Sequence, residues 1–154
     1  MFRRIDRHAS SRRVDTLRGM AAFQGMPEDL LRRLDALLYE TVLPSGTEIM
    51  IEGRSADQAF VIADGTAEVS VGNRVVAYIS SGDLAGEVGL LDDLPRSATV
   101  RAVTPLRVFV MGPRQFRALF DDSRFGLWVA GNLAKRLRSA NSRISTSAPA
   151  QLFG

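Results

Sequence analysis

Apolar residues repeat at helical spacing in the first forty or so positions of the chain. Val14, Leu17 and Met20 lie three residues apart, so a helix is expected from about Arg13. A second helix is expected from Pro27, because proline favours the first helical position and the acidic residues after it suit a first turn. The apolar stripe of this second helix consists of Leu30, Leu31, Leu34, Leu37 and Leu38.

The middle of the chain changes to short apolar runs separated by turn signals rich in glycine, asparagine and proline. Glycine and asparagine supply the positive φ that tight turns need, so the runs are expected to be antiparallel strands. Short strands at this spacing are typical of a small barrel or double-sheet roll. The expected strands are Thr41–Leu43, Glu48–Ile51, Gln58–Ala63, Thr66–Val71, Arg74–Ile79, Ala98–Ala102 and Leu106–Met111.

Helical signals return near the C-terminal end. Pro113–Phe120 predicts a short helix, and Asp121-Asp122-Ser123 resembles an N-cap cluster for a longer helix that runs to about Ile144. The predicted fold is therefore α+β and mainly β, an antiparallel jelly-roll β-barrel flanked by N-terminal helices and a C-terminal helix pair. A four-three-four spacing on the last helix fits either a homodimer seam or packing on the barrel: Leu133, Leu137, Ala140 and Ile144.

Composition narrows the class of protein. A chain of 154 residues with 45% apolar content suits one packed domain, expected here over residues 13–144. The chain has no cysteine, no apolar run long enough for a membrane span and no secretory signal, which favours a cytoplasmic protein. Residues 145–154 are small and polar and are expected to form a flexible tail.

Basic charge is concentrated at the N-terminal end. The net charge is only +3, but nineteen of the twenty basic residues are arginine, and several fall within residues 1–12, which are expected to form a flexible arm. Two interpretations remain open: a solvated arm, or a contact with nucleic acid, anionic lipid or an acidic partner. The arginines at this end are Arg3, Arg4, Arg7, Arg12, Arg13 and Arg18.

The segment from Gly86 to Thr99 carries the chemistry of an anion site. Gly86 permits close backbone approach, and the exposed N–H groups of the helical turn that Glu87 begins favour an anion. Arg96 can bind phosphate oxygens through two parallel hydrogen bonds. Glu87 would repel a phosphate, so its expected role is to accept a hydrogen bond from a ribose 2′-hydroxyl. The alternative is an ordinary barrel connection with a surface ion pair between Glu87 and Arg96.

Together with its setting, this segment resembles the phosphate-binding cassette of cyclic-nucleotide-binding domains, as found in catabolite activator proteins, kinase regulatory subunits and nucleotide-gated channels. Other stretches that resemble the family are Phe23–Leu30, Leu43–Gly46, Ile51–Gly53 and Leu133–Leu137. The resemblance implies that a mobile C-terminal helix closes over the base. It also implies the contact residues, with ribose on Gly86 and Glu87 and phosphate on Arg96, Ser97 and Ala98. Independently of the resemblance, small or apolar residues are expected to leave space beside the sugar: Val61, Ala85, Val88 and Ala98.

The departures from the family pattern affect the base and the output. The chain ends too soon for the helix-turn-helix of the bacterial transcription factors, so DNA binding is not expected. Asn141 lies near the positions that meet adenine in those proteins, and it is either a base contact or an exposed helix residue. Arg136 is either a partner of Glu87 or part of a solvated face, and Trp128 either covers the base or belongs to the core. Ser97 is compatible with cyclic GMP as well as cyclic AMP.

An enzyme is not expected. The single histidine, His8, lies in the arm, and with no cysteine the chain offers no metal cluster or nucleophile–base pair. The sequence therefore predicts a sensor that binds cyclic AMP or cyclic GMP, with cyclic AMP favoured. No cofactor or metal is expected, and the sensor is expected to signal to an unknown protein effector through its C-terminal helix. The alternatives are an empty cassette in a protein-interaction barrel, or a nucleic-acid or anionic-surface contact through the arginine arm.

Overall fold

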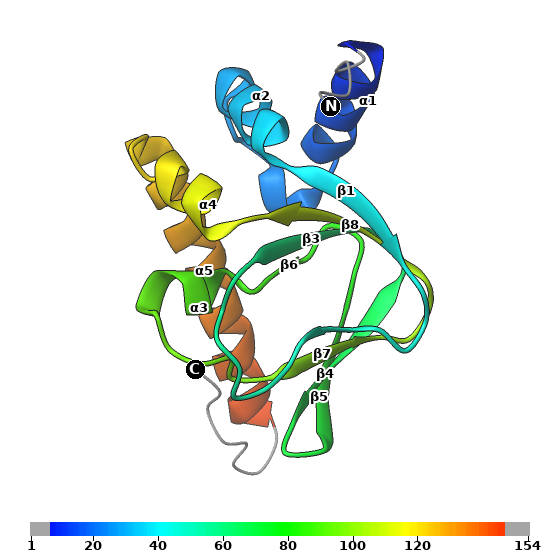
Figure 1. Ribbon diagram of the computed structural model, residues 1–154. Coiled ribbons are helices and arrows are strands. Elements are labelled where there is room, and N and C mark those ends of the chain that lie inside the picture. The colour runs from blue at the N-terminus through cyan, green and yellow to red at the C-terminus, as the bar shows by residue number, and fades with distance from the viewer. Residues whose placement is uncertain (1–6, 147–154) are drawn as a thin grey trace. The chain divides into compact units, whose positions relative to one another are not determined.

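Figure 1 shows the computed structural model of the protein, which describes residues 7–146, with side chains described for residues 12–139, 141 and 142. Half of the predicted arm and most of the predicted tail lie outside these residues. The chain divides into two units, Met1–Phe116 and Arg117–Gly154, which are described separately below. None of the described helices combines the length and apolar character needed to cross a membrane.

The first unit opens with helices. These are α1 (Arg7–Arg18), the 3-10 turn η1 (Ala21–Phe23) and α2 (Glu28–Leu37). Helix α1 begins at Arg7 rather than near Arg13, since the added residues contain no glycine or proline to stop the helix. An ion pair joins α1 to α2, because Arg13 donates from Nε to Asp35 Oδ1 and from Nη2 to the Asp35 carbonyl at 2.9 Å. Asp35 is only 2% exposed, so this pair fixes how the two helices pack.

Two antiparallel four-stranded sheets follow. One has the order β1-β8-β3-β6 and the other β2-β7-β4-β5. Every strand expected from the sequence is present, with ends displaced by no more than two residues. The strands are β1 (Tyr39–Leu43), β2 (Glu48–Met50), β3 (Ala59–Asp64), β4 (Thr66–Val71), β5 (Arg74–Ser80), β6 (Leu84–Ala85), β7 (Thr99–Ala102) and β8 (Leu106–Met111).

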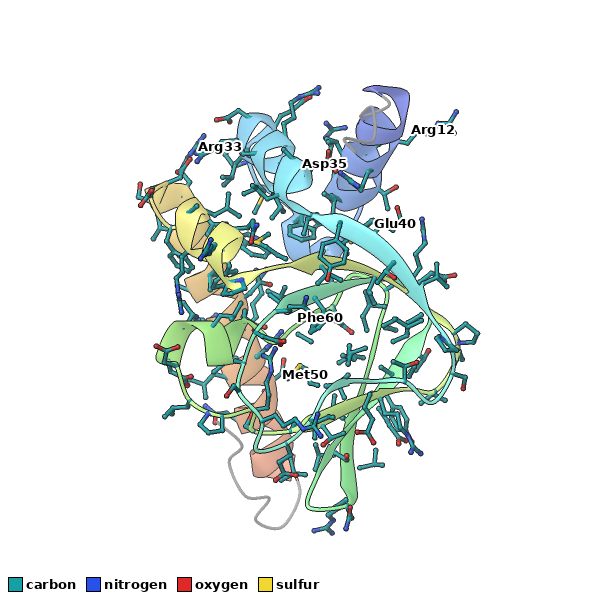
Figure 2. The ribbon with its side chains drawn as sticks, in the orientation of Figure 1. Arg12, Arg33, Asp35, Glu40, Met50 and Phe60 are labelled. Carbon is teal, nitrogen blue, oxygen red and sulfur yellow. The ribbon has the colours of Figure 1, made fainter. Side chains whose placement is uncertain are left out.

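The core of this unit lies between the two sheets. Phe60 and Ile62 of β3 meet Val100 and Ala102 of β7 in one buried cluster, and Met50 of β2 packs against its margin. Figure 2 shows Phe60 and Met50 directed into the space that the sheets enclose. Each sheet thus buries one face against the other sheet. The predicted jelly-roll architecture is confirmed.

The sequence analysis missed strand β6. It contains only two residues, which pair with β3 as Phe60↔Ala85 and Val61↔Leu84. Two residues are too few to show an alternating pattern, so no periodicity marked them. Their pairing matters for the site because it places the following residue, Gly86, beside the start of β3.

The C-terminal helices are α4 (Pro113–Leu119) and α5 (Ser123–Thr146), which confirms the predicted helix pair. The predicted N-cap is formed by Asp122, whose Oδ1 accepts the Arg124 N–H at 3.0 Å. In the second unit Phe125 makes an edge-to-face contact with Phe120 and stacks on Trp128, at centroid distances of 5.1 and 5.7 Å. Trp128 therefore packs on Phe125 of the same helix and stays half-buried, and its predicted role over the base stays a prediction.

Candidate functional site: an arginine and a glutamate buried in the cassette

Helix α3 (Glu87–Asp92) begins directly after Gly86, as the sequence predicts for the cassette. Gly86 has φ 89° and ψ −4°, a left-handed conformation that side chains disfavour. A Cβ atom at this position would lie 2.7 Å from the carbonyl oxygen of Gln58 and 2.9 Å from Nη1 of Arg96. Glycine is therefore required here both by the backbone angles and by the close approach of Arg96.

Arg96 is held inside the site through its side chain. Its guanidinium donates from Nη1 to the Gly86 carbonyl at 2.7 Å and from Nη2 to the Gln58 carbonyl at 2.5 Å. Asp57 Oδ1 lies 3.8 Å from Nη2 on the exposed side. Arg96 is buried, with only 5% of the residue exposed. These contacts therefore hold its guanidinium in a well-defined position.

The main chain of Arg96 is held as well. Its N–H donates to the Arg54 carbonyl, and its carbonyl accepts from the Gly53 N–H, both at 2.8 Å. Residues 53 and 54 thus pair with Arg96 in the manner of a short antiparallel ladder. Both the backbone and the side chain of Arg96 are thus held by hydrogen bonds.

Glu87 is the second charged residue buried in the cassette. It is 1% exposed, with both carboxylate oxygens buried. Burial lowers the pKa of Arg96, while the negative charges of Asp57 and Glu87 act in the opposite direction and raise it. Arg96 and Glu87 therefore interact as buried charges, and the alternative of a surface ion pair between them is wrong.

The other predicted site residues divide between the two units. Val61 on β3 and Ala85 on β6 are buried, Val88 and Ala98 are half-buried, and Ser97 is exposed. All of these belong to the first unit with Gly86, Glu87 and Arg96. Arg136 and Asn141 are exposed residues of α5 in the second unit, and their predicted roles at the base and beside Glu87 stay predictions.

The sequence analysis missed the residues that hold Arg96 in place. They belong to the connection between β2 and β3 and include Gly53, Arg54, Asp57 and Gln58. Three of these four contacts are made by main-chain atoms, so the residue types in the sequence do not indicate them. The one available signal was the Ile51–Gly53 stretch, which the family resemblance included without assigning a role.

Comparison with known proteins agrees with this geometry. The fold is a double-sheet roll with a buried arginine beside the α3 turn. The family model described as cyclic nucleotide-binding domain matches residues 40–123, which is more than half of the chain. The chain belongs to the cyclic nucleotide-binding domain family.

Individual relatives support the same assignment. A cAMP-dependent protein kinase regulatory subunit of Yarrowia lipolytica is 44% identical over 87 residues, which is 55% of this chain and 23% of that protein. The chain spans about a quarter of the length of the curated relatives it matches. These relatives are regulatory subunits of a protein kinase, in agreement with the prediction of a regulatory rather than an enzymatic domain.

Solved structures share the fold. The regulatory domain of Toxoplasma gondii PKA with cAMP superposes with a TM-score of 0.72 at 20% identity, over 82% of this chain and 50% of that one. The catabolite activator protein of Thermus thermophilus superposes with a TM-score of 0.71 at 24% identity, over 81% and 62%. At these identities the likeness concerns the fold alone.

Proposed function

We propose that this domain binds a 3′,5′-cyclic nucleotide at the cassette, with cyclic AMP preferred to cyclic GMP, and that binding changes the state of α5. The observation that carries the proposal is the guanidinium of Arg96, buried and held by the carbonyls of Gly86 and Gln58. A buried cation in a fixed orientation is suited to a phosphate that carries one negative charge.

The two buried charges have complementary roles in this proposal. Each terminal nitrogen of Arg96 carries two N–H groups, and each uses one of them on a backbone carbonyl. The remaining donors serve the exocyclic phosphate oxygens. Glu87 accepts a hydrogen bond from the ribose 2′-hydroxyl, which stays free in a 3′,5′-cyclic nucleotide.

The proposed preference for cyclic AMP rests on the description of a relative. The Yarrowia lipolytica kinase subunit named above is described as cAMP-dependent. Ser97 is exposed beside the cassette and is compatible with a guanine contact, so cyclic GMP binding at lower affinity is expected as well.

Isothermal titration tests the proposal. Cyclic AMP is expected to bind with one site per chain, cyclic GMP more weakly and 2′-deoxy cyclic AMP more weakly again, because the last ligand lacks the hydroxyl that Glu87 recognises. Adenosine 5′-monophosphate, with two negative charges and an open phosphate, serves as the control. Absence of heat with both cyclic nucleotides at high micromolar concentration would contradict the proposal and favour the empty-cassette alternative.

The output is proposed to pass through α5 to a protein effector with an acidic surface. Helix α5 carries five basic residues and no acidic one. The run Ala134–Ser139 is exposed on every side, including Leu137 at 58%. Two copies of this helix would place like charges together, so an acidic partner fits the helix better than the homodimer seam does.

A further inference from the structure

The connection between β2 and β3, residues 51–58, supplies most of the contacts of Arg96. We refer to it as the arginine loop. Its Gly53 and Arg54 pair with the Arg96 main chain, and its Asp57 and Gln58 meet the guanidinium. Motion of this loop would therefore displace both the backbone and the side chain of Arg96, the residue proposed to bind phosphate.

The start of the arginine loop is fixed by Glu52. The Glu52 N–H donates to Thr99 Oγ1 at 3.0 Å, at the start of β7. The Glu52 carboxylate reaches the other way, where Oε2 accepts the Gly72 N–H at 2.9 Å. Gly72 and Asn73 form the tight turn between β4 and β5, with φ of 54° and 65°, and such two-residue turns are firmly set by the paired strands on either side.

The end of the arginine loop is fixed by a second side chain. Gln58 Nε2 donates to the hydroxyl of Tyr39 at 2.9 Å, at the beginning of β1. Gln58 is also the residue whose carbonyl accepts from Arg96 Nη2. One residue thus faces the guanidinium through its main chain and Tyr39 through its side chain.

These contacts fix the arginine loop at two points, and we call the residue at each point an anchor. One anchor contacts each sheet. Glu52 connects it to the β4–β5 turn, and Tyr39 connects it to β1. A loop of this length without strand or helix structure is otherwise among the first parts of a domain to open. Restricting a loop in its binding conformation improves affinity by lowering the ordering cost at the moment of binding.

We propose that Glu52 and Tyr39 are positioning residues for phosphate recognition, acting on the ligand through the arginine loop and Arg96 without touching it. The proposal rests on the proposed function, because it assigns to these residues an effect on the same cyclic phosphate site. It predicts that each contributes to affinity only while Arg96 is present.

The first test compares cyclic AMP affinity of full-chain variants by titration. Glu52→Ala and Tyr39→Phe should each weaken binding about three- to tenfold, the range expected for one lost hydrogen bond. Glu52→Gln, which keeps an acceptor oxygen, should recover most of the loss. Glu40→Ala, which breaks an ion pair with Arg107 on β8, and Tyr78→Phe, at an exposed tyrosine, are the matched controls and should change affinity less than twofold.

The second test separates positioning from general loss of structure. In an Arg96→Ala background, Glu52→Ala and Tyr39→Phe should have effects below twofold, because there is no guanidinium left to position. Full additivity of the effects would overturn the proposal. So would unchanged affinity in the single variants.

A third measurement uses the ligand-free protein. Amide hydrogen exchange at Gly53 and Arg96 should become about three- to tenfold faster in Glu52→Ala, since these N–H groups form the ladder that the anchor supports. Unchanged exchange would show that Glu52 does not hold the arginine loop. If the wild type binds neither cyclic nucleotide, the proposed function fails. The exchange result in the ligand-free protein still decides whether Glu52 supports the backbone of Arg96.

Discussion

Burying the guanidinium of Arg96 costs free energy unless its charge and its N–H donors find partners. The carbonyls of Gly86 and Gln58 satisfy donors, and Glu87 and Asp57 supply opposite charge. Asp57 is the weakest of these partners, since its side chain is 80% exposed and 3.8 Å away. The proposed anionic ligand would therefore compete with Asp57 for Arg96, and Asp57 is a distant and exposed carboxylate.

The first residue-scale prediction concerns Arg96→Ala. Removing one partner of a buried charge pair typically costs ~2–5 kcal/mol, so cyclic AMP affinity should fall at least about thirtyfold in a titration. Arg96→Lys keeps the charge but loses the bidentate contact, so its affinity for cyclic AMP should lie between those of Arg96→Ala and the wild type. A change of less than about threefold for Arg96→Ala would remove Arg96 from the phosphate site.

The second residue-scale prediction concerns two glycines with nearly the same backbone angle. Gly46 has φ 88° and open space where a Cβ would lie, whereas Gly86 has φ 89° and a crowded site. Gly46→Ala should cost about 1–2 kcal/mol from the left-handed conformation alone. Gly86→Ala should cost a further ~1–3 kcal/mol from overpacking, measured by urea unfolding. Equal costs would mean that the close approach of Arg96 to Gly86 is easily relieved.

At the scale of elements, the N-terminal helices are joined by one buried ion pair, beside an exposed pair between Arg18 and Glu28. Arg13 on α1 meets Asp35 on α2, and the Asp35 side chain is 2% exposed while that of Arg13 is 25% exposed. The contact between these helices is therefore expected to be sensitive to a single charge.

Replacing Arg13 by methionine tests this element. The variant keeps an unbranched apolar stem but removes the charge beside Asp35, and it should lower the free energy of unfolding by about 2–4 kcal/mol, below the full value for a fully buried pair. Arg32→Met is the matched control, because Arg32 pairs with Glu28 where both side chains are largely exposed. The control should lose less than about 1 kcal/mol in the same denaturation experiment. Similar losses in both variants would argue against a special role for the Arg13–Asp35 pair.

The elements were largely predictable from the sequence because their signals are local. The short apolar runs, the turn glycines and the N-cap at Asp122 each act within a few residues. The chemistry of Gly86, Glu87 and Arg96 was also local, as a small residue, a carboxylate and a guanidinium in one segment. The arginine loop was not predictable, because Gln58 meets Arg96 from 38 positions away through a carbonyl oxygen that every residue possesses.

At the scale of the whole molecule, the proposed ligand site lies in the first unit and the basic helix α5 in the second. A ligand shifts α5 only by the difference between its affinities for the two states of the protein. Amide exchange along residues 123–142 should therefore slow when cyclic AMP is added at about a hundred times its dissociation constant. The Arg96→Ala variant at the same ligand concentration should show no such change. Identical exchange with and without ligand in the wild type would show that α5 does not respond to cyclic AMP.

Charge at the two ends of the chain gives the last prediction. A labelled polyglutamate peptide is expected to bind the wild type with an affinity that falls as salt increases. Replacing Lys135, Arg136 and Arg138 by serine should weaken this binding about tenfold, while replacing Arg3 and Arg4 should change it less than twofold. The reverse order of effects would assign the acidic partner to the N-terminal arm instead, and preferential binding of a DNA duplex would favour the nucleic-acid alternative.

The aromatic stack in α5 has a practical consequence. Trp128 is the only tryptophan in the sequence, and its indole lies against Phe125 in the unit that does not carry the cassette. Its emission spectrum consequently belongs to a single, known place in the protein. A change in fluorescence on adding cyclic AMP would be a signal generated in one unit and detected in the other, so the native chain carries its own optical reporter of communication between them.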